Sequence, residues 1–410
     1  MPFFNIKFWL KISLINLLIV ASLGVLMRYK IGFDFPYFSQ KNIQHAHSHF
    51  AFAGWITHAL YVLMIHFVLK KFPQNDTKNY KRLIVANLIC SYGMLFSFSY
   101  QGYSTLSIIF STITIIIACF FTFYYYKDLK EIDNSDPSKP WFKAALLFNL
   151  ISSIGTFYLA YMMASRNFNE HWYLASVYFY LHFQYNGFFI FSCLGLFFSE
   201  CNTLFPQFKY NKLFFKLFYA SFIPAYFLST LWAKLPIWLY IITVIAAFTQ
   251  VFAWFKIIKA IMLALKSGST LNKFQAYLFL FVGFAFTVKL LLQLGSTIPS
   301  VSDLAFGFRP IVIAYLHLVL LGVISAFILA FIYTFNLIVV NKLTAIAFSV
   351  FLIGIFLNEL VLGIQGVAAF SNIVVKFVNE ILFGVALLLL LGAILVVRSQ
   401  EQKETNSFLL

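Results

Sequence analysis

The chain of 410 residues is 62% hydrophobic and 20% aromatic, and only 10% of its residues are charged, with a mean hydropathy of +0.87. So apolar a composition excludes a soluble globular protein and predicts an all-α, polytopic protein that lies in a lipid bilayer. The formal charge of +16 does not indicate nucleic-acid binding, because the basic residues stand in short loops beside apolar runs, where they encode topology.

Apolar runs bounded by charged or turn residues predict twelve transmembrane helices, forming a single integral membrane domain over residues 1–410. Each run is long enough to cross about 30 Å of hydrocarbon. A count of ten or eleven stays open, because the turn near Gln101-Gly102 and the link Ala233 to Pro236 carry little charge. The predicted spans are residues 8–27, 44–69, 83–101, 103–126, 141–164, 172–199, 213–232, 236–258, 274–294, 310–337, 343–368 and 377–397.

The orientation follows from the lysine and arginine residues. Most of the 29 basic residues fall before the first span or in loops that alternate with it on the same side of the membrane. Basic loops are typical of the cytoplasmic face. We therefore expect both termini in the cytoplasm and a bacterial inner membrane as the location.

A short pattern, [His/Tyr]-x-His-x4-Gly, recurs in the second, sixth and tenth predicted spans. Its recurrence in every fourth span predicts a chain of three comparable thirds, with a pseudo-threefold arrangement of four-helix arcs. Imidazoles are costly to bury in a membrane, so they indicate function. The three histidine and glycine pairs are His49 with Gly54, His182 with Gly187, and His317 with Gly322.

Three histidines open the second span. His45 and His49 are four residues apart and share a helical face, whereas His47 points almost oppositely. Neutral imidazole is the usual protein ligand of heme iron and of copper, so one of the three is a candidate ligand. The alternative is a set of hydrated residues at the membrane boundary. His58, further along the span, is expected to support a ligand or to bond between helices.

The other two patterns differ in their surroundings. His182 lies in an unusually polar run with Tyr185, which favours either metal ligation or a structural hydrogen-bond network between helices. His317 has an apolar setting, which favours ligation.

Three charged residues stand in or beside later spans. Lys289 of the ninth span and Glu359 of the eleventh are expected to form an ion pair with each other or to line a water-filled path through the membrane. Lys289 and Arg309 are candidates to hold heme propionates by charge-assisted hydrogen bonds. Structural salt bridges are the alternative for each, and Arg309-Pro310 is also typical of a helix start.

Twelve spans, histidines in spans 2, 6 and 10, and the threefold pattern resemble the catalytic subunit of the heme-copper oxidase superfamily, including its nitric-oxide reductases. The resemblance implies that the histidine cluster of span 2 and His317 hold a low-spin heme b. It also implies that His182 corresponds to a ligand of a second metal, which leaves copper open as a second cofactor.

The sequence departs from that family at two places. Span 7 has no histidine where the family has a His-His pair, and Tyr315 stands where the family has the ligand of a high-spin heme. The binuclear oxygen-reducing centre is therefore incomplete. NnrS-type proteins, which are linked to nitric-oxide stress and contain heme and copper, offer a second resemblance through histidine-rich helix starts.

These observations favour a heme-binding membrane protein with redox or gas-ligand chemistry, with nitric oxide favoured over oxygen. His182, Tyr185, Tyr315 and Glu359 are expected to line the second site, which leaves copper, a gas or water open as its occupant. The chain has no C-x-x-C motif of a c-type heme, so quinol or a redox partner protein would supply electrons. The alternatives are a secondary transporter with twelve helices, and a heme or nitric-oxide sensor or assembly factor without turnover; catalytic residues are not assigned.

Overall fold

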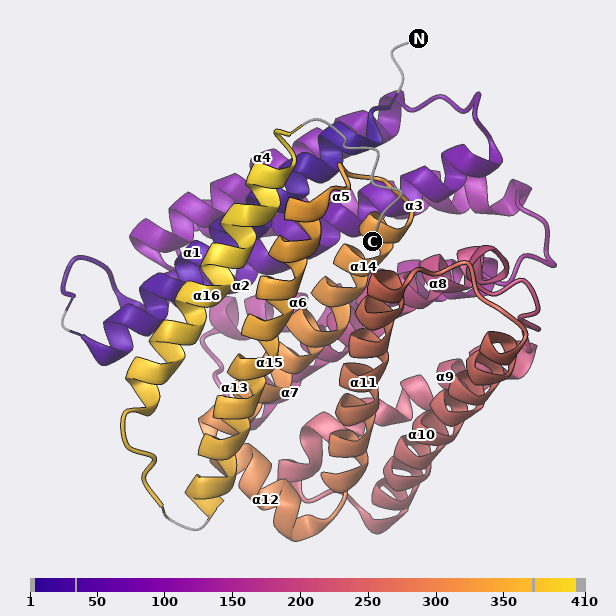
Figure 1. Ribbon diagram of the computed structural model, residues 1–410. Coiled ribbons are helices and arrows are strands. Elements are labelled where there is room, and N and C mark those ends of the chain that lie inside the picture. Colours follow the sequence, from indigo (N-terminus) through magenta and orange to yellow (C-terminus); the bar gives the residue numbers. More distant parts are fainter. Residues whose placement is uncertain (1–3, 34, 371–372, 403–410) are drawn as a thin grey trace. The chain divides into compact units, whose positions relative to one another are not determined.

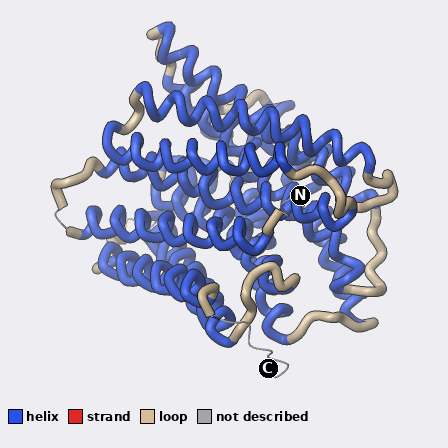
Figure 2. Tube along the Cα trace, turned by 90° about the horizontal axis from the view of Figure 1, so that it is seen from above, coloured by secondary structure: helices blue, strands red, loops and turns tan. Residues whose placement is uncertain are grey.

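The computed structural model describes residues 4–33, 35–370 and 373–402, and every regular element among them is helical (Figures 1 and 2). Within these described ranges, twelve helices are long and apolar enough to cross a membrane. All twelve predicted spans are confirmed in their order along the chain. The protein is an all-α, polytopic membrane protein that lies in a lipid bilayer.

The described residues divide into two compact units, which are treated separately. The first unit combines residues 1–125 with residues 325–410. Within it, α16 packs side by side with both α15 and α1, while α2 packs along α4 (Figure 1). Its elements are α1 (Ile6–Gly32), α2 (Gln40–Phe50), η1 (Ala51–Thr57), α3 (His58–Lys71), α4 (Lys78–Gln101), most of α5 (Thr105–Glu131), α14 (Ala326–Thr334), α15 (Lys342–Phe370) and α16 (Val378–Ser399).

The second unit comprises residues 126–324. Here α6 packs along the whole of the sixth span, and α10 packs against α9, η3 and α11. Its elements are α6 (Lys139–Ser165), α7 (Glu170–Leu181), η2 (His182–Phe189), α8 (Ile190–Leu204), α9 (Lys212–Phe222), η3 (Pro224–Ala233), α10 (Ile237–Lys266), α11 (Lys273–Gly295), α12 (Pro299–Gly307), α13 (Arg309–His317) and η4 (Leu318–Ser325).

Most observed spans run a few residues beyond the predicted apolar runs, because polar caps start the helices. Asn5, Ser39, Asn169 and Asn211 each accept a hydrogen bond from a backbone N–H of the first turn that follows. The two uncertain boundaries are real: the chain turns with positive φ at Gly102 and Lys234. The short helix α12 was not predicted.

The recurring histidine pattern corresponds to a recurring backbone feature. Each of the three spans winds into a π-helix close to its patterned histidine: η1 in span 2, η2 in span 6 and η4 in span 10. π-Helical turns are rare and occur often at functional sites. In their most apolar stretches, these spans have 83%, 78% and 50% of residues buried, against no more than 39% in the other spans. The patterned spans are therefore the most enclosed helices of the chain.

The patterned glycines fit this packing. A Cβ at Gly54 would lie 2.8 Å from the Phe50 ring, and one at Gly187 would lie 2.7 Å from Phe148 Cβ. Neither position has room for a side chain. Glycine lets both π-helices pack closely against aromatic rings.

Candidate functional site

His47 lies against the first helix of its own unit. Its Nδ1 is 3.1 Å from the carbonyl oxygen of Val20, one turn from Gly24. A Cβ built on Gly24 would lie 3.7 Å from His47 Cε1, so the ring packs on glycine backbone. A carbonyl oxygen only accepts hydrogen bonds, so Nδ1 carries the ring proton and the lone pair lies on Nε2.

His45 and His49 lie on another side of α2, towards the turn between α4 and α5. The His49 ring stacks on Phe98 at 4.3 Å between centroids, and its Nε2 is 3.2 Å from the Tyr103 hydroxyl. The His45 ring meets Tyr103 edge-on at 4.7 Å. His45 Nε2 is buried and has no hydrogen-bond partner among the described residues. The structure thus separates the three histidines as their spacing predicts.

Side chains from two neighbouring helices satisfy backbone groups of η1. The amide of Asn16 on α1 donates to the Gly54 carbonyl at 2.6 Å, and the amide of Asn87 on α4 donates to the Ala53 carbonyl at 3.0 Å. Tyr92 donates to Asn16 Oδ1 at 2.7 Å. These bonds hold the π-turn that follows the histidine cluster.

Replacing Asn16 by leucine should destabilise the protein. The substitution leaves the Gly54 carbonyl and the Tyr92 hydroxyl without their partners, and each lost bond to a buried group costs roughly 1–3 kcal/mol. Denaturant titration in detergent micelles measures the loss. Ser22→Ala is the matched control on the same helix, because the Ser22 hydroxyl bonds only to Leu18 of its own turn and is exposed. Equal stability of the two variants would contradict this role for Asn16.

His58 occupies the interhelical position that the sequence suggested. It is fully buried, and its Nδ1 is 2.7 Å from the Ser13 hydroxyl on α1. Its Nε2 has no hydrogen-bond partner among the described residues. The Ser13 contact ties α3 to α1 below the histidine cluster.

His182 in the second unit is bound to a carbonyl that a helix break sets free. The helix α9 ends at Phe222, just before Pro224, which has no backbone N–H. In a continuing α-helix the N–H of Tyr226 would donate to the Phe222 carbonyl, four residues earlier. Here the N–H of Tyr226 donates to the Ile223 carbonyl instead. The Phe222 carbonyl oxygen lies 3.0 Å from His182 Nε2, which must donate to it. The lone pair of His182 is therefore on Nδ1, opposite to the arrangement at His47.

The surroundings of His182 form a polar network inside η2. Its ring stacks on Phe222 at 4.6 Å, and Asn186 Nδ2 is 3.4 Å from Nδ1. Gln184 accepts a 2.9 Å hydrogen bond from Ser152 of α6. This is the structural network that the polar run suggested, and any metal at His182 would have to use Nδ1.

Lys289 is buried in the same unit. Its side chain is 3% exposed, and its ammonium lies 5.6 Å from the centroid of Phe286. It makes no hydrogen bond or ion pair that involves a described residue. One turn further along α11, Gln293 Oε1 is buried and also lacks a hydrogen-bond partner in the described part of the chain. Lys289 and Gln293 are therefore two buried polar side chains on one face of α11.

The remaining predicted site residues fall in different places. Tyr185 is buried, and Tyr185 and Tyr315 both belong to the second unit. Glu359 lies in the first unit, where it accepts a 3.0 Å hydrogen bond from Asn358. Arg309 begins α13, as its helix-start pattern predicts, and its side chain lies outside what the structure describes.

His317 at the end of α13 repeats the hydrogen bonding of His47. Its Nδ1 is 2.8 Å from the carbonyl oxygen of Ile313, one turn earlier in the same helix. Nδ1 therefore donates and the lone pair lies on Nε2. His47 and His317 share this tautomer, whereas His182 has the other.

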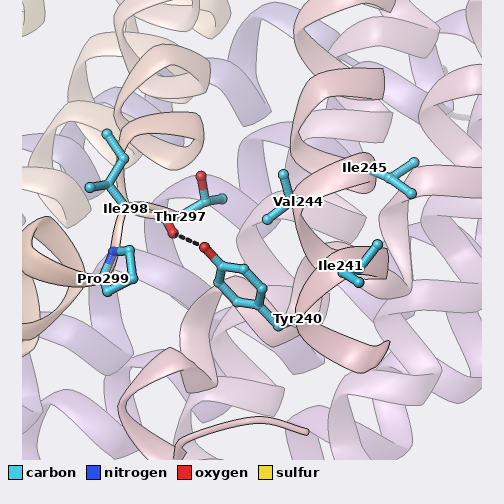
Figure 3. Close-up of a pocket in the computed structure, with 7 residues that line it drawn as sticks. All are labelled: Tyr240, Ile241, Val244, Ile245, Thr297, Ile298 and Pro299. Carbon is cyan, nitrogen blue, oxygen red and sulfur yellow. Dashed lines mark hydrogen bonds between the residues drawn. The ribbon is translucent and has the colours of Figure 1, made fainter. Parts of the chain in front are cut away.

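A surface hollow in the described part of the chain is unrelated to these histidines. It lies between α10 and the link from α11 to α12, has a volume of about 330 Å³ and is lined mainly by aliphatic side chains (Figure 3). Tyr240 closes one side by donating to the Thr297 carbonyl at 2.7 Å. Its lining residues are Tyr240, Ile241, Val244, Ile245, Thr297, Ile298 and Pro299.

Three residues that shape the site were not predicted: Asn16, Asn87 and Phe222. The first two had a signal, because an asparagine inside a leucine-rich span needs a partner. Phe222 acts through its backbone carbonyl, which accepts the hydrogen bond from His182. Pro224 in span 7 indicated that a backbone carbonyl nearby would lack its helical hydrogen bond.

Comparison with protein-family models gives no match, and comparison with curated proteins gives none either. Within the described ranges, no three His, Cys, Asp or Glu side chains gather as a metal-binding group. The fold and the hydrogen bonding of individual histidines therefore carry the functional argument.

Proposed function

We propose that this protein binds heme b, with His47 of span 2 and His317 of span 10 as the axial ligands. The observation that supports the proposal is the matched hydrogen bonding of the two imidazoles. Each donates its Nδ1 proton to a backbone carbonyl, at 3.1 Å and 2.8 Å. Metal-binding histidines almost always donate their other ring N–H in this way, which fixes the tautomer and the ring orientation.

The donor set fits a low-spin heme. Such a heme needs two neutral imidazoles, each with one unprotonated ring nitrogen, and apolar surroundings that bury the macrocycle. In both His47 and His317 the unprotonated nitrogen is Nε2. Spans 2 and 10 supply the imidazoles in apolar helices that are more enclosed than most other spans. His49 fits less well, because its Nε2 is occupied by the Tyr103 hydroxyl.

A bound heme supplies one-electron exchange between ferric and ferrous iron. The protein's residues would hold and orient it: Lys289 and Arg309 are the proposed partners of the propionates. Lys289 is suited to this because a buried ammonium that forms no ion pair with any described residue favours an anion beside it.

The second part of the proposal is a site for a gas ligand, nitric oxide rather than oxygen, near His182 with Tyr185 and Tyr315. A bis-histidine iron has no open coordination position, so a gas must bind elsewhere or displace a ligand. Copper at this site would use His182 Nδ1, and Glu359 remains a proposed lining residue. His182→Ala should keep the low-spin heme spectrum and weaken nitric-oxide binding roughly tenfold or more. His171→Ala is the control, and unchanged binding in His182→Ala would contradict the second site.

The physiological setting follows from the same proposal. Electrons would come from quinol or from a redox partner protein, and the chain would lie in a bacterial inner membrane with both termini in the cytoplasm. The resemblance to heme-copper oxidases and nitric-oxide reductases is part of this proposal, and the three π-helical spans support it. We expect an oxidoreductase activity only if the protein passes these electrons on to an acceptor molecule.

Heme content per chain tests the proposal. A pyridine hemochrome assay on the purified protein should give one heme b per polypeptide. Heme binding without electron transfer to any acceptor would favour a sensor or an assembly factor. Solute uptake by proteoliposomes that contain no heme would favour a transporter.

A further inference from the structure

Arg28 places a charged group in the last two turns of α1. It lies in α1, four residues before the end of that helix, and is half-buried. Its guanidinium makes no hydrogen bond or ion pair with any residue that the structure describes. Lys30, at a similar depth on α1, donates instead to the Phe35 carbonyl. Arg28 lies one residue beyond the apolar run 8–27, and a half-buried arginine at the end of a span needs an anion or water to meet its charge.

Arg28 shares a face of α1 with the contact surface of His47. Val20, Gly24 and Arg28 follow one another at four-residue spacing, so they form one stripe along the helix. His47 meets this stripe at the Val20 carbonyl and beside Gly24. A helix rises about 1.5 Å per residue, which places Arg28 roughly 6 Å further along the stripe than Gly24.

We propose that Arg28 binds a propionate carboxylate of the heme that His47 holds; this inference rests on the proposed function. Arginine suits the task because its planar guanidinium can hold both oxygens of one carboxylate. The chemistry that Arg28 requires is an oxyanion, and a phospholipid phosphate at the membrane boundary is the other possible source. The experiment separates the two sources.

The test is the midpoint potential of the heme in the full-length, heme-loaded protein, measured by redox titration. Arg28→Gln should keep its heme and its low-spin spectrum, because both axial histidines remain. A cation near the heme favours the ferrous state. Its removal should lower the ratio of reduced to oxidised heme about tenfold at a fixed potential, equal to about 59 mV for one electron. Lys30→Gln removes the same charge at similar depth from a different face of α1 and should change the ratio less than twofold.

Each outcome decides a separate point. Wild-type protein without heme would refute the proposed function itself. Wild-type protein with heme, together with equal potentials in Arg28→Gln and Lys30→Gln, would refute only the role of Arg28. If Arg28→Gln does not retain heme, Arg28→Lys should restore heme binding, because it keeps the charge; a heme-free Arg28→Lys would indicate a structural role and overturn the proposal.

The lipid source is tested by comparing phospholipid vesicles with a medium that contains no phosphate. The difference in potential between wild type and Arg28→Gln should be the same in phosphatidylglycerol vesicles and in maltoside micelles in a phosphate-free buffer. If the difference appears only in the vesicles, Arg28 binds a lipid phosphate and the propionate assignment is wrong.

Discussion

Replacing His317 by alanine should remove most of the heme from the purified protein. Loss of an outer partner of a metal ligand typically lowers metal affinity about 10- to 100-fold, and loss of the ligand itself should cost at least as much. Heme that remains should be high-spin, because one axial position would be open. Pyridine hemochrome content and the optical spectrum of the variant measure both effects.

Leu316→Ala is the matched control for this prediction. Leu316 lies one residue earlier in α13, on a different side of the helix. The variant tests whether any change in this helix releases heme. Unchanged heme content and an unchanged low-spin spectrum in His317→Ala would exclude His317 as a ligand.

The second large effect is expected at His47, and it should distinguish this residue from the other two histidines of α2. His47→Ala should reduce heme content as strongly as His317→Ala, because the proposed bis-histidine coordination loses an equivalent ligand. His49→Ala and His45→Ala should retain heme, because their rings face Phe98 and Tyr103 instead. Parallel expression of the three variants, with heme normalised to protein, provides the comparison.

One outcome would reassign the ligand without ending the heme proposal. His49 is the residue that shares the position of His317 in the repeated pattern, whereas His47 shares its hydrogen bonding. If His49→Ala loses heme and His47→Ala retains it, His49 is the ligand. The position in the repeated pattern would then identify the ligand, and the hydrogen bonding of Nδ1 would not.

The twelve spans were predictable because the membrane imposes a simple rule. A helix must keep apolar side chains over about 30 Å, so composition alone locates it. The ends were less predictable. Caps such as Asn5 and Asn272 start helices outside the apolar runs, and Asn272 forms a capping box with Gln275. The link helix α12 carries too little apolar sequence to be recognised as a span.

The candidate site was predictable only in part. The spacing of His45, His47 and His49 predicted two opposite faces, and the structure has them. Which face meets α1 depends on packing between helices, which one sequence does not encode in any local pattern. The bond between His182 and Phe222 depends on a carbonyl that Pro224 frees 40 residues away. Such contacts become visible only in the folded chain.

The most direct test of the central claim is a reduced-minus-oxidised optical spectrum of the purified wild-type protein. Coordination by two histidines predicts the sharp bands of a low-spin b-type heme, at one heme per chain. No heme signal after expression with an adequate heme supply would contradict the account, and His47 and His317 would then be structural histidines of a helical membrane protein.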